Sequence, residues 1–157
     1  MQTLEVLKNP NPFLREKSTP LKEDEISAPT TQDLIDSMIK TMHETNGIGI
    51  AAPQVGVHQR MIIVETGHGP IAFINPKITS KSLRKIESEE GCLSVPDVYG
   101  IVKRHKKIKV EALSREGKLL KLEVTGLQAV IFQHEIDHLD GILFIDKVKK
   151  YTSPPRM

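Results

Sequence analysis

The segment LQAVIFQHEIDHLDG, residues 127–141, most constrains the fold because it combines an apolar helical pattern with two histidines four positions apart. On a helix this spacing places His134 and His138 one turn apart on the same face, where both imidazoles can bind one metal ion. Glu135 lies beside them and can act as a general base toward a water molecule. Burying two imidazoles is costly unless they have partners. The segment therefore predicts a late, buried, metal-binding helix, with a chance H-E-x-x-H match on an ordinary helix as the alternative.

A catalytic site of this kind usually needs a third protein ligand, and the residues after His138 do not supply one. The position at which metzincins carry a further histidine is Phe144. A thermolysin-like enzyme takes a downstream glutamate, but the acids after His138 are Asp140 and Asp146. The third ligand is therefore expected upstream. Cys92 is the candidate, because a thiolate with two imidazoles is an accepted catalytic set, and the alternative is a small buried core residue.

The remaining patterns predict one earlier helix and several strands. Apolar residues recur at helical spacing over residues 34–42, with Thr30 or Thr31 as the cap and Asn46-Gly47 at the end. Residues 1–30 are rich in proline and predict extended coil with one short turn near Phe13. Strands are expected at residues 61–65, 70–76, 108–114 and 119–126, and the last two form a hairpin about a turn at 115–118.

The late helix shows boundary signals at both ends. Thr125 and Gln128 have the spacing of a capping box, and Gly141 follows the last apolar position. A further strand is expected after it, before the chain ends. We therefore expect an α+β fold of mostly antiparallel strands around a late catalytic helix carrying H-E-x-x-H, with residues 1–157 forming a single domain.

Charge and cysteine content narrow the classes of function. The chain has 22 basic and 20 acidic residues and a net charge of +2, so no direct nucleic-acid site is expected. The basic run at residues 103–107 is interpreted as a solvated strand face. No apolar run approaches the roughly 20 residues that span a membrane. The single cysteine excludes an internal disulfide and suits a reducing compartment, so we expect a cytoplasmic protein.

Three segments together resemble the signature motifs of peptide deformylases, in the same order and at similar separations. They are GIGIAAPQ at residues 47–54, EGCLS at 90–94 and QHEIDHLDG at 133–141. The resemblance extends over nearly the whole chain. It implies a metal-dependent hydrolase that removes the N-formyl group from the formyl-methionine of newly made polypeptides, and a place in protein biosynthesis.

The resemblance also implies roles for individual residues. Cys92, His134 and His138 are the implied metal ligands, and Glu135 is the implied general base and acid. Gln54 and the backbone N–H of Leu93 form the implied oxyanion hole, and Glu90 pairs with Arg104 behind the ligands. The implied substrate-binding residues, for which core packing is the alternative at the apolar positions, are Gly47, Ile48, Gly49, Gly91, Leu127, Val130 and Ile131.

The implied metal is Fe²⁺, with Zn²⁺, Ni²⁺ or Co²⁺ as substitutes. Two features depart from many members of the family. Tyr99 lies near a position where many bacterial members carry an arginine that reaches toward the substrate. The basic C-terminus, with Lys147, Lys149 and Lys150, is a short candidate for ribosome contact, since Pro154 and Pro155 stop a long helix. We expect a monomer.

Three rival interpretations differ in what they require. A phosphate-binding loop at residues 47–49 lacks a third glycine that opens a helix. A general metallopeptidase does not explain the Cys92 segment. A metal-binding protein without catalysis is expected to have lost Glu135 or Gln54, and both are present.

Overall fold

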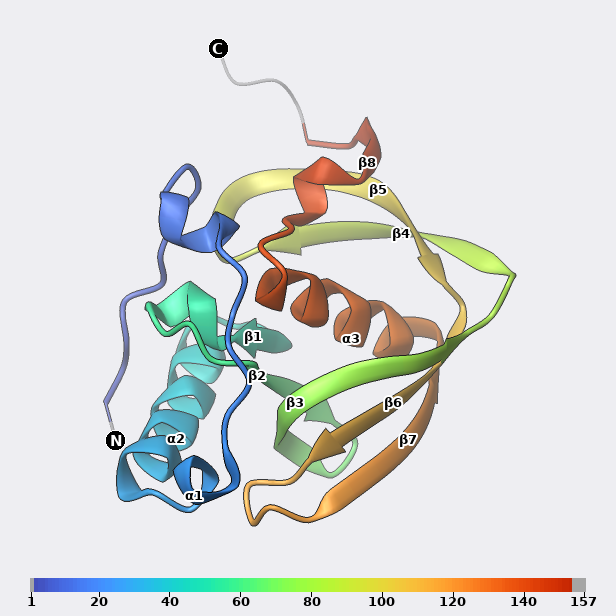
Figure 1. Cartoon of the computed structure of the whole chain (residues 1–157). Coiled ribbons are helices and arrows are strands. Elements are labelled where there is room, and N and C mark those ends of the chain that lie inside the picture. The colour runs from blue at the N-terminus through green and yellow to red at the C-terminus, as the bar shows by residue number, and fades with distance from the viewer. Residues whose placement is uncertain (1, 154–157) are drawn as a thin grey trace.

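The computed structural model describes residues 2–153, whose strands form two antiparallel sheets (Figure 1). The larger sheet has the order β1-β2-β3-β6-β7, with β1 (Gly49–Ala51), β2 (Met61–Thr66), β3 (Gly69–Lys81), β6 (Lys107–Leu113) and β7 (Leu119–Thr125). The smaller sheet has the order β4-β5-β8, with β4 (Lys85–Cys92), β5 (Val95–His105) and β8 (Val148–Tyr151). Every neighbouring pair within these sheets is antiparallel.

The late helix predicted from the H-E-x-x-H segment is α3 (Gly126–Leu139), and strands of both sheets contact it (Figure 1). Gly141 adopts φ 74° just after the helix, a left-handed conformation that glycine tolerates best. The fold class, α+β with mostly antiparallel strands around a late helix, is therefore confirmed. The earlier helix is α2 (Pro29–Glu44), preceded by a short α1 (Glu23–Ile26).

Strand β2 explains how α2 and α3 sit on opposite faces of the larger sheet. Ile62 and Val64 pack in one apolar cluster with Phe132 of α3. Met61 and Ile63 pack in another cluster with residues of α2. Because successive side chains of a strand point to opposite faces, this continuous apolar run is buried on both sides. The larger sheet is thus held mainly by apolar burial, and α3 packs on one of its faces.

The cap predicted for the earlier helix is wrong, and the capping box predicted for the late helix does not form. Helix α2 begins at Pro29 with Ala28 as its N-cap, and the hydroxyl of Thr31 donates to the carbonyl of Glu25 instead. Proline suits this first position because its missing N–H costs nothing there. Thr125 is the N-cap residue of α3, but its side chain makes no capping bond. The amide of Gln128 donates instead to the carbonyl of Glu65, 3.0 Å away, and ties α3 to β2.

The segments between the predicted elements hold more structure than the patterns indicated. The glycine-rich stretch at residues 47–56 contains β1 and a 3₁₀ turn η2 (Ala52–Val55). Charged residues alternate along β4, so its strand pattern was missed. Strand β5 was predicted only at its end, in the basic run at residues 103–107. The basic run at 103–107 is also not a uniformly solvated face, since Arg104 is only 3% exposed.

Short elements complete the described chain. The turn predicted near Phe13 is η1 (Pro12–Arg15), and η3 (Phe144–Asp146) follows α3. The strand predicted after the late helix is β8, which pairs with β5. Pro154 and Pro155, which were expected to stop a C-terminal helix, lie outside the described residues. No helix among residues 2–153 has both the length and the apolar character needed to cross a membrane.

Candidate active site

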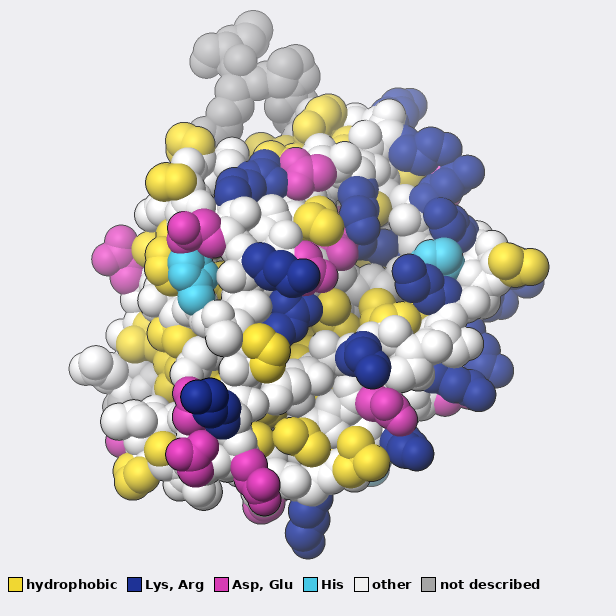
Figure 2. Space-filling model, in the orientation of Figure 1, with side chains coloured by type: hydrophobic (Ala, Val, Ile, Leu, Met, Phe, Trp, Pro, Cys, Tyr) yellow, Lys and Arg dark blue, Asp and Glu magenta, His cyan; other side chains and the backbone are white. Residues whose placement is uncertain are grey.

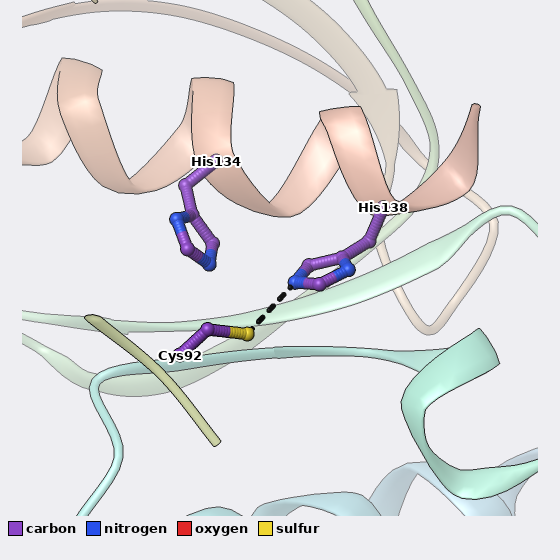
Figure 3. A group of neighbouring side chains, drawn as sticks. All are labelled: Cys92, His134 and His138. Atoms are coloured by element: carbon purple, nitrogen blue, oxygen red, sulfur yellow. Dashed lines mark hydrogen bonds between the residues drawn. The ribbon is translucent and has the colours of Figure 1, made fainter. Parts of the chain in front are cut away.

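Cys92, His134 and His138 lie together although they come from two elements far apart in the chain (Figure 3). Helix α3 places the two histidines one turn apart, with ring centroids 5.1 Å from each other. Cys92 ends β4, and its Sγ lies 3.3 Å from Nε2 of His138. One ligand atom from each of the three side chains lies within 4.8 Å of the other two. This separation suits three ligands of a single ion.

A buried chain of charges fixes the orientation of His134. Nδ1 of His134 lies 2.8 Å from Oε1 of Glu90, so Nδ1 is the ring nitrogen that forms the hydrogen bond with Glu90. Arg104 donates from Nε and Nη2 to the two Glu90 oxygens, each at 2.8 Å. The predicted Glu90–Arg104 pair is therefore confirmed. Arg104 also donates to Asp137 at 2.7 Å, and Lys147 lies 3.0 Å from the same carboxylate.

Burial and neighbouring charges shift the pKa values of three side chains at the site in different directions. Burial lowers the pKa of His134, but hydrogen bonds with Cys92 and Glu90 outweigh it and raise that pKa to about 10. Burial, with the charges of His134 and Arg104, lowers the pKa of His138 well below its usual value. Burial raises the pKa of Glu90, but Arg104 and His134 bring it down to about 2. The site thus combines an ionised carboxylate with one imidazole that favours its protonated form and one that favours its neutral form.

A divalent transition-metal ion fits these residues on two further observations. Thiolate and imidazole donors suit first-row transition metals, and three protein ligands leave a position for water or substrate. Among the described residues, Oε1 of Glu135 is buried without a hydrogen-bond partner, next to the ligands along α3. A buried carboxylate oxygen needs a partner, and a water molecule at the open position of such an ion supplies one.

Glu135 has the properties of a general acid and base. It is 5% exposed, and burial raises its pKa to about 7, where it can both accept and donate a proton near neutral pH. Its carboxylate lies against the backbone of β1. A Cβ added at Gly49 would meet Oε2 of Glu135 at 2.6 Å, so a larger residue there displaces the carboxylate. Glycine at this position is therefore required by the approach of Glu135.

Gln54 points its amide group at the ligand cluster. Its Oε1 accepts from the backbone N–H of Ala51 at 2.9 Å, which fixes which end of the amide faces the site. Its Nε2 donates to Oγ of Ser94 at 3.1 Å and lies 3.5 Å from Sγ of Cys92. Along the chain, Leu93 lies between Cys92 and Ser94, and it lines a cleft together with Gln54. The amide N–H₂ is thus held close to the place where a reacting oxygen would sit.

A cleft of about 590 Å³ opens beside these residues, within the usual range for ligand sites. Gln54, Cys92, Leu93, His134 and Glu135 line it, whereas His138 does not. The cleft also contains every residue predicted to bind substrate: Gly47, Ile48, Gly49, Gly91, Leu127, Val130 and Ile131.

The apolar members of that set divide into an exposed rim and a buried floor. Ile48 and Leu127 are 52% and 64% exposed, whereas Val130 and Ile131 are 4% and 6% exposed. Ile131 also belongs to the apolar cluster of the larger sheet, so the core-packing alternative holds for it as well.

Four residues that contribute to the site were not singled out from the sequence. Ser94 accepts from Gln54, and Asp137 holds Arg104. Gln133 accepts from the backbone N–H of His105 at 2.9 Å and donates to its carbonyl at 2.8 Å, which joins α3 to β5. Ser94, Asp137 and Gln133 lie within the quoted motifs. Their place in a motif indicates that they matter, but it does not indicate which partner each one binds. Nothing in the sequence indicates that Ala51 anchors Gln54 through its backbone.

Comparisons with known proteins agree on one family. The family model described as polypeptide deformylase matches residues 3–153. A peptide deformylase of Desulfitobacterium hafniense is 49% identical over 137 residues, covering 87% of this chain and 89% of the relative.

Solved structures give the same result. A class I type b peptide deformylase from Acinetobacter baumannii has a TM-score of 0.91 at 39% identity, covering 94% of this chain and 100% of the other. A crystal structure of the class I type b enzyme from the same organism with Met-Ala-Ser bound has a TM-score of 0.88 at 37% identity, covering 93% and 98% of the two chains.

Proposed function

The chain belongs to the polypeptide deformylase family, and we propose that the site described above carries out the reaction of that family. The protein is a metal-dependent hydrolase that removes the N-formyl group from the N-terminal formyl-methionine of newly made polypeptides. Because the family match spans nearly the whole sequence, we treat residues 1–157 as one catalytic domain.

The observation that carries the residue assignment is the convergence of Cys92, His134 and His138 beside the buried carboxylate of Glu135. The three ligand atoms lie within 4.8 Å of one another, and Glu135 is the neighbour of His134 along α3. We assign the first three as metal ligands and Glu135 as the proton-transfer residue. When bound, a divalent ion supplies Lewis-acid chemistry, which polarises a carbonyl oxygen and lowers the pKa of a water molecule toward about 7.

In the proposed mechanism Glu135 takes a proton from the water that attacks the formyl carbon. Its pKa of about 7 suits this step, and burial keeps the carboxylate away from bulk solvent. Negative charge then develops on the formyl oxygen, and Nε2 of Gln54 and the backbone N–H of Leu93 donate to it. Removing one such donor typically costs roughly 10²–10³ in rate. Glu135 finally donates its proton to the departing amine of methionine.

The cleft suits an extended peptide that enters between two sheet edges. Strand β1 is the edge of the larger sheet and β4 is the edge of the smaller one, and residues of both line the cleft. Unpaired edges bind extended chains through backbone hydrogen bonds. We therefore propose that the nascent chain lies along Gly49 and Gly91. The methionine side chain enters the apolar part formed by Ile48, Leu127 and Val130.

The metal and the cellular setting extend this proposal. We propose Fe²⁺ as the cellular metal, with Zn²⁺, Ni²⁺ or Co²⁺ as possible substitutes, because one thiolate and two imidazoles accept all four. We also propose that the protein works as a monomer in the cytoplasm.

Ribosome contact through the basic C-terminus is a further part of the proposal. Lys149 and Lys150 are exposed on β8, whereas Lys147 is paired with Asp137. Lysine and arginine side chains gather on the side of the molecule that carries the β4–β5 hairpin (Figure 2). A basic surface of this kind attracts a polyanion.

The test is formate release from a formyl-methionyl peptide after anaerobic purification, with metal content measured on the same samples. The wild type is expected to retain about one metal ion per chain and to release formate. Glu135→Ala is expected to retain metal and lose nearly all activity, because it removes only the proton-transfer group. A wild type that holds stoichiometric metal and releases no formate would contradict the proposed function. Comparable cleavage of the same peptide without its formyl group would favour a general metallopeptidase.

A further inference from the structure

The N-terminal segment at residues 6–9 connects the two parts of the chain that carry the proposed oxyanion-hole donors. The backbone N–H of Leu7 donates to the carbonyl of Gln54 at 2.7 Å, and that of Asn9 donates to the carbonyl of Ser94 at 2.8 Å. Gln54 belongs to η2, which follows β1 of the larger sheet, whereas Ser94 lies between β4 and β5 of the smaller sheet. The segment therefore joins both sheets at the candidate active site, and the function proposed so far gives it no role.

A side-chain hydrogen bond closes this connection into a ring. Nε2 of Gln54 donates to Oγ of Ser94 at 3.1 Å, so each of these two residues is bound once through its backbone and once through its side chain. Leu7 and Asn9 are two positions apart, so the chain between them completes the ring. Leu93, whose N–H is the other proposed donor, directly precedes Ser94. One proposed donor thus belongs to the ring, and the other adjoins it.

The ring is buried, so its hydrogen bonds are shielded from competition by water. Gln54 and Ser94 are 1% and 0% exposed. Val6 is 8% exposed, and Leu7 packs against an apolar cluster that contains Val95 of β5. A buried backbone carbonyl needs a hydrogen-bond partner, and the N-terminal segment supplies one on each side of the site.

The segment lies beside the cleft, but its hydrogen-bonding residues do not face it. Lys8 lines the cleft, whereas Leu7 and Asn9 on either side of it do not. Neither Leu7 nor Asn9 is therefore placed to contact the substrate. Any effect of these two residues on the reaction must pass through the residues that their N–H groups bind.

Two donors that meet the same oxygen must be held at a fixed separation. Donors that are already in place stabilise the developing negative charge without reorganising during the reaction. Gln54 and Leu93 come from different sheets, so their separation depends on how the sheets are joined. A misplacement of about 1 Å at a reacting centre typically costs about 10²-fold in rate. A buried ring of hydrogen bonds across the two sheets suits this requirement.

We propose that Leu7 and Asn9 are positioning residues for the deformylation reaction. Their backbone N–H groups hold Gln54 and Leu93 at the separation that two donors to one oxygen require. The inference rests on the proposed function and gives the N-terminal segment a part in it. Because the donors act on charge that develops only in the transition state, loss of this restraint lowers kcat and leaves KM close to its wild-type value.

The test replaces the backbone N–H of Leu7 by an ester oxygen, using the α-hydroxy analogue of leucine, so that the side chain is unchanged. The replacement removes the hydrogen bond to Gln54. With formyl-Met-Ala-Ala amide, kcat is expected to fall by about tenfold, less than the roughly 10²–10³ expected for removal of a donor. KM is expected to stay within about twofold. Metal content is expected to stay at about one ion per chain.

Leu4 provides a matched control in the same segment. Its backbone N–H donates to Oγ1 of Thr41 in α2 at 2.9 Å, and neither residue lines the cleft. The same ester at Leu4 therefore removes one hydrogen bond, keeps a leucine side chain and leaves the ring around Gln54 intact. It is expected to leave kcat within about twofold, because it does not touch the donors.

The Gln54→Ala background separates positioning from general weakening of the fold. Without the Gln54 amide the ring is already open, and there is no donor at that position to misplace. The Leu7 ester is then expected to lower kcat by about twofold or less, instead of tenfold. A purely structural role would lower kcat by the same factor in both backgrounds.

The proposal fails if the Leu7 ester keeps the wild-type kcat, if the Leu4 ester lowers kcat equally, or if the full effect persists in Gln54→Ala. It also fails if KM rises while kcat is unchanged. If the Leu7 ester does not fold, the ester at Asn9 removes the bond to Ser94 and carries the same expectations. A wild type that releases no formate contradicts the proposed function itself, so the two failures are distinguishable.

Discussion

The two sheets of this protein hold the same site by different kinds of interaction. In the larger sheet, β2 buries Ile62 and Ile63 on opposite faces, and both are fully buried. In the smaller sheet, the buried groups behind the site include an ion network. Arg104 has a side chain that is 2% exposed and binds the carboxylates of Glu90 and Asp137.

The larger sheet mainly stabilises the fold, whereas the ion network of the smaller sheet orients a candidate metal ligand. Apolar packing is non-directional, so the larger sheet can support α3 without defining how one imidazole is turned. Hydrogen bonds to a carboxylate are directional, and Glu90 sets the ring of His134 through Nδ1. Each sheet then contributes one edge strand to the cleft, β1 from the larger sheet and β4 from the smaller one. Substitutions in the larger sheet should therefore lower stability, whereas substitutions in the ion network of the smaller sheet should also lower metal affinity.

Arg104→Ala should have the largest effect, because it leaves Glu90 and Asp137 without their buried partner. Breaking a buried pair from one side typically costs about 3–5 kcal/mol of unfolding free energy, which urea denaturation measures. Metal affinity should also fall by roughly 10–100-fold, since the ligand His134 loses its fixed orientation. Arg115→Ala is the control. Arg115 pairs with Asp36 at the surface, and its loss should cost about 1 kcal/mol or less.

Ile62→Ala should destabilise the protein by about 2–5 kcal/mol through the cavity it leaves in the larger sheet. Unlike Arg104→Ala, it should retain wild-type metal affinity when measured below its unfolding transition. Leu119→Ala, in the same sheet but 62% exposed, should change stability by no more than about 0.5 kcal/mol. Loss of metal affinity in folded Ile62→Ala would remove the distinction between the two sheets.

Gly49→Ala tests the contact between the larger sheet and the proposed proton-transfer residue Glu135. The new Cβ would lie 2.6 Å from Oε2 of Glu135 and must displace that carboxylate. A displacement of about 1 Å typically costs about 10²-fold in rate, and kcat/KM for formyl-Met-Ala-Ala amide measures it. Gly67→Ala is the control, because nothing lies within 4 Å of the added Cβ there. Equal activity of the two variants would show that Glu135 does not need the close approach of β1.

Asp146→Asn should have the smallest effect. It compares a surface ion pair with the buried ion pairs of Arg104 and so tests whether burial makes the Arg104 pairs stronger. Asp146 pairs with Arg15 at the surface, and the hydrogen bond with Arg15 lowers the pKa of its carboxyl group. A lowered pKa contributes stability above the unfolded pKa of about 3.9, and the contribution is lost as the pH falls further. The variant should therefore lose up to about 1 kcal/mol at neutral pH. Its difference from wild type should shrink toward pH 2, in urea titrations at each pH.

The sequence predicted the parts of the fold whose patterns are local. The late helix within the segment 127–141 and the hairpin around Gly117 follow from periodicity and turn residues, and both are present, the helix as Gly126–Leu139. Strand β4 was missed because Glu87 and Glu89 alternate with less polar residues and resemble a solvated stretch, and β5 was predicted only at its end. Their burial depends on partners elsewhere in the chain, which no local pattern reveals.

The candidate site divides in the same way. His134, Glu135 and His138 follow from spacing on one helix, and elimination of downstream ligands led to Cys92. The pair of Glu90 and Arg104 was predicted only through the resemblance. The contact of Arg104 with Asp137, 33 positions away along the chain, was not predicted. The contact of Tyr99 with Gly91 could not be derived either, since it depends on a register irregularity between β4 and β5.

The central claim is that the smaller sheet delivers Cys92 to the same ion that α3 binds through His134 and His138. X-ray absorption at the zinc edge of the zinc-loaded protein tests it directly. We predict one sulfur neighbour at about 2.3 Å and two imidazole nitrogens at about 2.0–2.1 Å, with the sulfur lost in Cys92→Ala. A wild-type spectrum without sulfur, or one that Cys92→Ala leaves unchanged, would contradict the account.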